Sequence, residues 1–322
     1  TEGPELLLPH LAQAKMMSRI ARLRVMWDLQ NGRPAEARDD LLATLALTRR
    51  ISHDGTLISV LVQIAMENIL ISTVAENFYQ FPPETLQQLE DGFEAAPARA
   101  TTAQAVATGE RSFQGWFRRK VLEAQKQHPG DEAAVMAGIR TTFQNLMAGG
   151  DESRSDLVDK VFKAAGGTSD GLLKIIAEMS PFYDRMTALL SLPRAEYEAQ
   201  IGPFSTEIQH SPNPLIIEFV PAVSKSRQKE FVVLAKLAML RAAVEYKLHG
   251  DAGFKSVIDP LGDGPFVRQR FMFKGVDRGF QLKSAYAGQI FPEAMIFVEK
   301  AGAPFFVEGK HAGAETKPGD TK

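Results

Sequence analysis

The sequence predicts a mainly α-helical protein, in which a repeat-like array of antiparallel helical hairpins precedes a long helix and a small C-terminal antiparallel β-sheet. Three observations support this fold class. Apolar residues recur at helical spacing through the first 250 residues, between short polar turns. An amphipathic stretch over residues 221–249 is long enough for one extended helix. After Gly250, apolar and polar residues alternate, as they do in half-buried strands.

Prolines near helix starts and Asn-Gly or Gly-Gly pairs at helix ends divide the array into about nine segments. Asp54 is a candidate cap for the third helix, and Pro181 should kink or break the eighth. The stretch 31–47 resembles half of a tetratricopeptide repeat, but no second copy aligns with it. The expected helices cover residues 5–30, 34–51, 56–79, 84–94, 97–127, 131–147, 153–165, 169–192 and 193–200.

The C-terminal part is expected to form two hairpins that bury one face against the long helix. Residues 266–274 and 280–286 form the first pair across a loop at 275–279, and residues 294–300 and 303–309 form the second. Turn-forming residues over 204–214 suggest a linker. The predicted organisation is therefore a helical array (1–203), a long helix with the sheet (204–309) and a disordered tail (310–322).

The stretch before the first strand is interpreted as a structural turn, formed by Asp259, Pro260, Gly262 and Pro265, with Gly262 and Gly264 free to adopt positive φ. The alternative is a metal loop. It would have only Asp259, Asp263 and Asp277 as ligands, which are too few and wrongly spaced for calcium.

Composition excludes several classes of function. The net charge of −2 disfavours binding to nucleic acid. The chain has no Cys, which excludes disulfides, thiolate metal sites and cysteine nucleophiles, and which suits an exported protein. The longest apolar run, residues 56–71, contains Gln63, Glu67 and Asn68 and is not expected to span a membrane. Because the chain starts at Thr1, we expect that a signal peptide or membrane anchor was removed upstream of it.

Local catalytic and metal motifs are weak. No His lies three to five residues from another, so we expect no zinc pair on one helix and no cofactor. The quartet Ser226 to Lys229 has the order of a serine/lysine hydrolase, but its charged neighbours predict an exposed turn and the companion motifs are absent.

The stretch 109–120, "GERSFQGWFRRK", is a candidate binding surface, because Trp and Arg dominate interface hot spots. In the alternative interpretation Trp116 packs in the core with Phe113 and Phe117, and Glu110 pairs with a buried Arg such as Arg49 or Arg50. The candidate binding residues are Trp116, Arg118, Arg119, Arg268 and Arg270, and the candidate structural residues of this stretch are Glu110 and Arg111.

Three stretches, 36–69, 109–113 and 234–250, resemble a family of uncharacterised bacterial proteins, exported or membrane-anchored, that combine a helical array with a small C-terminal segment. The C-terminal segment is similar to the Asp-Pro-x-Gly-x-Pro-Phe … Gly-Phe-x-Leu-x-Ser pattern of type II secretion pseudopilins. The matching residues are Asp259, Pro260, Gly262, Pro265, Phe266, Gly279, Phe280, Leu282 and Ser284. The calcium-binding run of pseudopilins is replaced by "AGQIFPEAM", so the resemblance does not imply calcium.

We therefore expect a non-enzymatic protein of the periplasm or cell envelope. It would bind a protein or peptide partner, or serve cell-envelope assembly, through its helical surface. The alternative is a hydrolase with a composite site in a cleft between the array and the sheet. A pseudopilin-like filament subunit is a third hypothesis, which requires an apolar helix upstream of Thr1.

Overall fold

The computed structural model of the protein describes residues 9–147, 153–262, 264–286 and 294–301. It is mainly helical, with a small antiparallel sheet after the longest helix, as the sequence predicts. The helices are α1 (Pro9–Gln30), α2 (Pro34–Ile51), α3 (Leu57–Glu76), α4 (Pro83–Ala95), α5 (Thr102–Ala105), α6 (Arg111–Gln127), α7 (Glu132–Met147), α8 (Ser153–Ala164), α9 (Ser169–Leu190), α10 (Arg194–Gln209) and α11 (Pro214–Ser256). The shorter elements are the turns η1 (Ser52–Asp54), η2 (Phe78–Gln80) and π-helical η3 (Val106–Glu110), and the strands β1 (Val267–Phe273), β2 (Val276–Lys283) and β3 (Met295–Val298).

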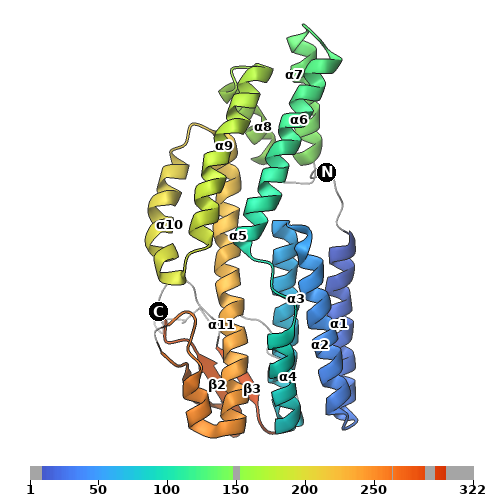
Figure 1. The fold of residues 1–322 in the computed structure, drawn as a ribbon, viewed down its shortest axis with the longest axis vertical. Helices are drawn as coiled ribbons and strands as arrows, with labels where there is room; N and C mark the ends of the chain where they lie inside the picture. Colours follow the sequence, from blue (N-terminus) through green and yellow to red (C-terminus); the bar gives the residue numbers. More distant parts are fainter. Residues whose placement is uncertain (1–8, 148–152, 263, 287–293, 302–322) are drawn as a thin grey trace, which may run out of the picture.

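Helix α11 is the spine of an elongated molecule (Figure 1). In the view of Figure 1, α6 to α10 form an upper half beside the first part of α11, and α1 to α4 with the sheet form a lower half beside its last part. Gly250, with φ at 68°, ends the straight part of α11, and a further helical turn runs on to Ser256.

Each half has its own hydrophobic core. The lower core combines α1 to α4 and the sheet with Val233, Leu240 and Val244 of α11. The upper core combines α6 to α10 with Val223 and Phe231 of the same helix. Since α11 supplies side chains to both cores, the position of each half is fixed relative to one shared element.

Helix α3 is a core helix of the lower half. Among the described residues it alone is long and apolar enough to cross a membrane, but 56% of that window is buried inside the protein. Its polar residues Gln63 and Glu67 are fully buried and bonded to other elements. Thr56, rather than the expected Asp54, caps the helix by accepting a hydrogen bond from the amide of Ser59.

Glu67 binds two arginines, the buried Arg49 and the partly buried Arg99. Arg99 donates to both of its carboxylate oxygens, at 2.7 to 3.0 Å, and Nε of Arg49 lies 3.5 Å from Oε1. Arg49 also donates to the carbonyl oxygen of Pro97 at 3.0 Å. Glu67 therefore ties α2 and α3 to the segment 96–101 that leads from the lower half to α5.

Two further polar side chains fix the same segment. Gln63 of α3 accepts from the amide of Ala100 and donates to its carbonyl, both at 3.1 Å. Glu230 of α11, which is 1% exposed, accepts from the amide of Thr102 at 3.2 Å and pairs with Arg227 at 2.9 Å. The connection between the halves is thus held by side chains from α3 and α11.

The two halves also meet at a close backbone contact between Gly55 and Gly109. Gly55 lies in the turn before α3, and Gly109 lies in η3. A Cβ atom on Gly109 would lie 2.4 Å from the carbonyl oxygen of Gly55. A π-helical turn inserts one extra residue into a helix. Here it places the backbone of Gly109, which carries no side chain, against the turn that contains Gly55.

The sheet has the order β1-β2-β3 and is antiparallel throughout. A two-residue turn at Lys274 and Gly275, both with positive φ, joins β1 to β2. Strand β2 therefore starts at Val276, within the loop expected at 275–279. The register of the β1–β2 pairing shifts at Arg278, between the pairs Phe271–Gly279 and Met272–Asp277. Gly279 has a φ of 144°, and a Cβ atom there would lie 2.1 Å from the carbonyl oxygen of Phe297. Phe280 and Phe297 stack at 5.2 Å on the inner face. The strand expected over residues 303–309 and the tail 310–322 lie outside the described residues.

Asp259 organises the turn before β1. Its side chain is buried, accepts from the amide of Leu261 at 2.9 Å and accepts a short hydrogen bond from Ser284. Its own amide donates to the carbonyl oxygen of Gly264 at 2.9 Å. These bonds are of the kind that hold a structural turn. Gly262 does not adopt the expected positive φ, but a Cβ atom there would lie 3.1 Å from the Asp259 carboxylate.

Several helices differ from the sequence-based expectation, among them α11, which spans Pro214–Ser256 instead of 221–249. The expected linker 204–214 is helical to Gln209, because Phe204 and Ile208 are buried in the upper core. The helix expected from residue 97 starts at Thr102, since the preceding segment is held in extended contacts by Glu67 and Gln63. Helix α9 continues through Pro181 without a break.

We expect that Glu67→Gln lowers the free energy of unfolding by about 3–5 kcal/mol, because it leaves the guanidinium groups of Arg49 and Arg99 without a carboxylate. Asp39→Asn is the matched control, since Asp39 forms an exposed pair with Arg38 and should contribute at most about 1 kcal/mol. Urea unfolding of the two variants and the wild type checks this. Equal stabilities for the two variants would contradict the assigned role of Glu67.

We expect that Gly109→Ala destabilises the protein by about 1–3 kcal/mol, because the new methyl group would clash with the Gly55 carbonyl. Gly138→Ala, in α7, is the control: no atom lies within 4 Å of its added Cβ, and Ala is favoured over Gly in a helix by up to about 1 kcal/mol. Thermal unfolding should therefore move in opposite directions for the two variants, and a stabilised Gly109→Ala variant would refute the close contact.

Candidate functional site

Helix α1 exposes a row of large apolar side chains to solvent. Met16, Ile20, Leu23 and Trp27 are 54 to 67% exposed, and their spacing of four, three and four residues aligns them along one side of the helix. Met17 beside them is 54% exposed. We call these five residues the α1 stripe. Figure 1 places α1 at the outer edge of the lower half.

The fold does not need the α1 stripe for its core. A separate face of α1, formed by Leu11, Ala14, Val25 and Leu29, is buried, and Val25 and Leu29 belong to the lower core. The helix is thus apolar on two sides, of which one packs inside the protein. Contiguous exposed apolar surface of this kind marks interaction sites.

The charge on α1 is one-sided. The helix carries Lys15, Arg19, Arg22 and Arg24, and its single acidic residue, Asp28, is buried and paired with Arg33. By helical geometry Arg19 and Arg24 flank the α1 stripe on opposite sides. Arg24 is 68% exposed and pairs with Asp40 at 2.8 Å. The stripe is therefore an apolar row with basic edges.

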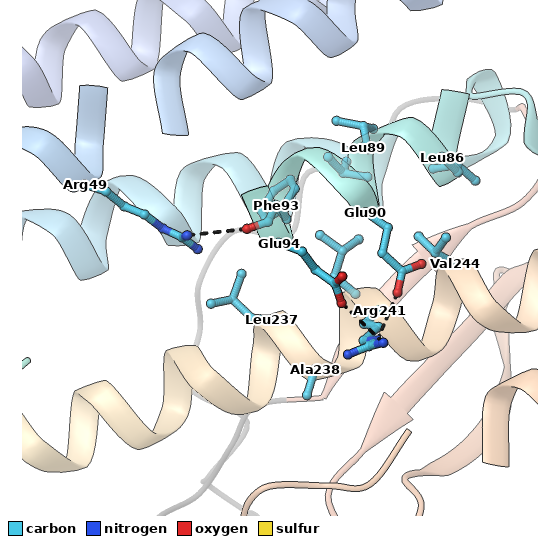
Figure 2. Close-up of a pocket in the computed structure, with 12 residues that line it drawn as sticks. Arg49, Leu86, Leu89, Glu90, Phe93, Glu94, Leu237, Ala238, Arg241 and Val244 are labelled. Carbon is cyan, nitrogen blue, oxygen red and sulfur yellow. Dashed lines mark hydrogen bonds and ion pairs between the residues drawn. The ribbon is translucent and has the colours of Figure 1, made fainter. Parts of the chain in front are cut away.

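A second candidate is a cavity of 270 Å³ between α4 and α11 (Figure 2). Its walls are mainly aliphatic, and most of them come from these two helices. The lining residues are Arg49, Val74, Leu86, Leu89, Glu90, Phe93, Glu94, Leu237, Ala238, Leu240, Arg241 and Val244. None of them belongs to the sheet, so this cavity is not the cleft between array and sheet that the hydrolase hypothesis requires.

Glu90 is the buried polar group of the cavity. It is 9% exposed, and its Oε1 forms an ion pair with Nε of Arg241 at 2.9 Å, while Oε2 is buried and has no hydrogen-bond partner within the described chain. Figure 2 shows Glu90 and Glu94 converging on Arg241. Burial raises the pKa of the Glu90 carboxyl, the neighbouring Glu245 raises it further, and Arg241 opposes both.

The residues expected to bind near position 116 divide between core and surface. Trp116 is 5% exposed and packs on Phe117 at 5.1 Å, as the core interpretation expected. Arg118 and Arg119 are exposed on α6. Arg111 forms an ion pair with Asp184 of α9.

The sequence predicted that Glu110 pairs with a buried Arg such as Arg49 or Arg50. The structure shows a different partner for Arg49. The carboxylate beside Arg49 belongs to Glu67, which lies one turn before Ile71 in α3. The side chain of Glu110 lies outside the described residues.

The two arginines of β1 take part in local contacts. Arg268 pairs with Asp251 at 2.9 Å and covers the ring of Tyr246 at 3.9 Å. Arg270 is exposed, pairs with Glu299 at 2.9 Å and contacts Asp277. Arg268 therefore holds the sheet to α11, whereas Arg270 links β1 to β2 and to the residue after β3. Pro260 and Pro265 of the preceding turn are exposed.

The catalytic motif at Ser226 does not lie on an exposed turn. It lies inside α11, which begins at Pro214, and Ser226 is 3% exposed while Lys229 is exposed. The prediction of a solvent-exposed turn at Ser226 was wrong, because α11 begins at Pro214, before the residues with the clearest helical periodicity. In the described part of the chain, no group of three or more His, Asp or Glu side chains could hold a metal ion.

Sequence reasoning missed both the α1 stripe and the cavity. A signal for the stripe was present, because residues 16, 20, 23 and 27 form an apolar row separate from the row at 11, 14, 25 and 29. The cavity had no local signal, since α4 ends at Ala95 and α11 begins only at Pro214.

Comparison with models of known protein families, with curated proteins and with solved structures returned no match.

We expect that Glu90→Gln changes how stability depends on pH. The raised pKa of Glu90 means that its contribution to stability is fully present below the unfolded pKa, about 4.5, and is lost as the pH rises through the folded value. Relative to the wild type, the variant should therefore gain stability as the pH rises from about 4.5 through the raised folded-state pKa of Glu90.

Denaturant unfolding across that pH range measures the difference. Glu94→Gln is the control, because Glu94 binds the same Arg241 from a side chain that is 62% exposed. A difference between the wild type and Glu90→Gln that does not vary with pH would contradict the assignment.

Proposed function

We propose that the protein is a non-enzymatic binding protein that docks an amphipathic helix of a protein partner on the α1 stripe. The observation that carries this proposal is the exposed row at Met16, Ile20, Leu23 and Trp27, which repeats at the spacing of a helix-packing seam. Amphipathic helices dock through apolar anchors at this kind of spacing. Trp27 supplies the aromatic anchor that is typical of interface hot spots.

The basic edges of the α1 stripe select the partner. An acidic helix would place carboxylates opposite Arg19 and Arg24, whereas a second copy of α1 would place arginines against arginines. We therefore assign the stripe to a different protein that carries an acidic amphipathic helix. The absence of Cys and the resemblance to exported bacterial proteins support a periplasmic or cell-envelope setting for this interaction.

The test uses a designed 21-residue peptide with Leu at the stripe spacing and Glu on both flanks, because the natural partner is unidentified. Trp27 lies in the stripe and Trp116 is buried, so a blue shift of tryptophan emission on binding reports docking at Trp27. We expect binding of the Glu-flanked peptide, weakened at least about tenfold when its flanks are Lys.

The double variant Ile20→Glu/Leu23→Glu should abolish peptide binding without changing the unfolding midpoint, because both side chains are exposed. Ile58→Glu, which changes an exposed apolar residue outside the stripe, is the control and should bind like the wild type. Equal binding of the two peptides would contradict the proposal. So would dimerisation through the stripe in sedimentation, or stripe-dependent binding to vesicles of phosphatidylglycerol.

A further inference from the structure

We propose that the cavity between α4 and α11 is a binding site for a small organic ammonium ion with an apolar body. The proposal is independent of the function assigned to α1, because the cavity and the α1 stripe share no residue. Nothing in the packing of either core requires the space, since both helices already contribute fully buried side chains to the lower core, such as Leu86 and Val244.

The walls of the cavity determine the body of the ligand. Leu86, Leu89 and Phe93 of α4 and Leu240 and Val244 of α11 line it, and Figure 2 shows the two helices side by side. An apolar cavity of about 150 Å³ can hold a benzene ring. The 270 Å³ available here therefore accommodates a ring or chain with a short polar arm, which is about nine or ten non-hydrogen atoms.

Glu90 determines the polar end of the ligand. Its Oε2 atom is buried and receives no hydrogen bond from any residue that the structure describes, although the side chain lines an open cavity. Buried polar atoms in folded proteins almost always have a partner. A ligand that places an N–H donor at this atom would complete the coordination that Arg241 begins at Oε1.

The surrounding charge favours a cation over an anion. Glu90, Glu94, Asp91 and Glu245 act on this end of the cavity, and among the described residues Arg241 is the cation that opposes them there. His249 bonds to Glu245 from an exposed position, where it adds positive charge only when protonated. Arg49 lies at the other end and is engaged by Glu67 and the carbonyl oxygen of Pro97. An ammonium ion beside Glu90 would balance the excess of carboxylates.

The test measures binding of three compounds of similar shape and different charge: 2-phenylethylammonium, the neutral 2-phenylethanol and the anion 3-phenylpropanoate. Methyl resonances of Leu86, Leu89 and Val244 in NMR spectra locate the ligand in the cavity. We expect saturable shifts with the ammonium ion and at least about tenfold weaker binding of the alcohol. The anion should not bind.

Three variants separate the roles of charge and space. Glu90→Gln keeps the size of the side chain and should weaken ammonium binding at least about tenfold. Ala238→Leu, at a half-buried wall position, fills the cavity and should abolish binding of both the ammonium ion and the alcohol. Glu94→Gln changes an exposed rim carboxylate and should reduce binding by less than Glu90→Gln does.

The proposal is overturned if none of the compounds shifts these methyl resonances at millimolar concentration. It is also overturned if Glu90→Gln binds the ammonium ion as tightly as the wild type while Ala238→Leu, folded by its unfolding midpoint, no longer binds it. Preferential binding of the anion would equally refute it. Peptide binding at the α1 stripe should be the same in all three variants, so a failure here leaves that proposal separately testable.

Discussion

The buried carboxylate of Glu67 is the constraint on which the arrangement of the two halves depends. It holds Arg49 of α2 and Arg99 of the segment that leads to α5, and its neighbour Gln63 holds the backbone of that segment. Desolvating three charged groups is costly unless each finds its partners in good geometry. The bidentate contact with Arg99 supplies that geometry, and the path of the chain between the halves follows from it.

Glu230 completes the same junction from the side of the spine. Its contact with the Thr102 amide fixes the start of α5 against α11, and the contact between Gly55 and Gly109 then brings η3 against the turn before α3. Hydrogen bonds, ion pairs and the close backbone contact require one specific geometry, whereas the burial of apolar surface is non-directional. They therefore define one position of the upper half, while the two cores supply most of the stabilisation.

Periodicity and turn chemistry predicted what depends on neighbours in the sequence. They located the helical hairpins, the long helix that changes character at Gly250 and the alternation in β2. They failed where a distant partner decides the outcome. Arg99 keeps residues before Thr102 out of a helix because Glu67 binds it, and Phe204 extends α10 because the upper core encloses it. For the candidate sites, the pattern of α1 contained the stripe, but no local pattern could place Glu90 beside Arg241.

The use of α11 by both cores has a consequence for synthesis of the chain. A ribosome makes the protein from the N-terminus, so α1 to α10 emerge before the helix that completes their packing. Neither half can close its core until residues 214–256 have been made, which leaves about two thirds of the protein waiting with apolar surface exposed. The order of the elements along the chain thus makes the completion of both cores a late event in folding.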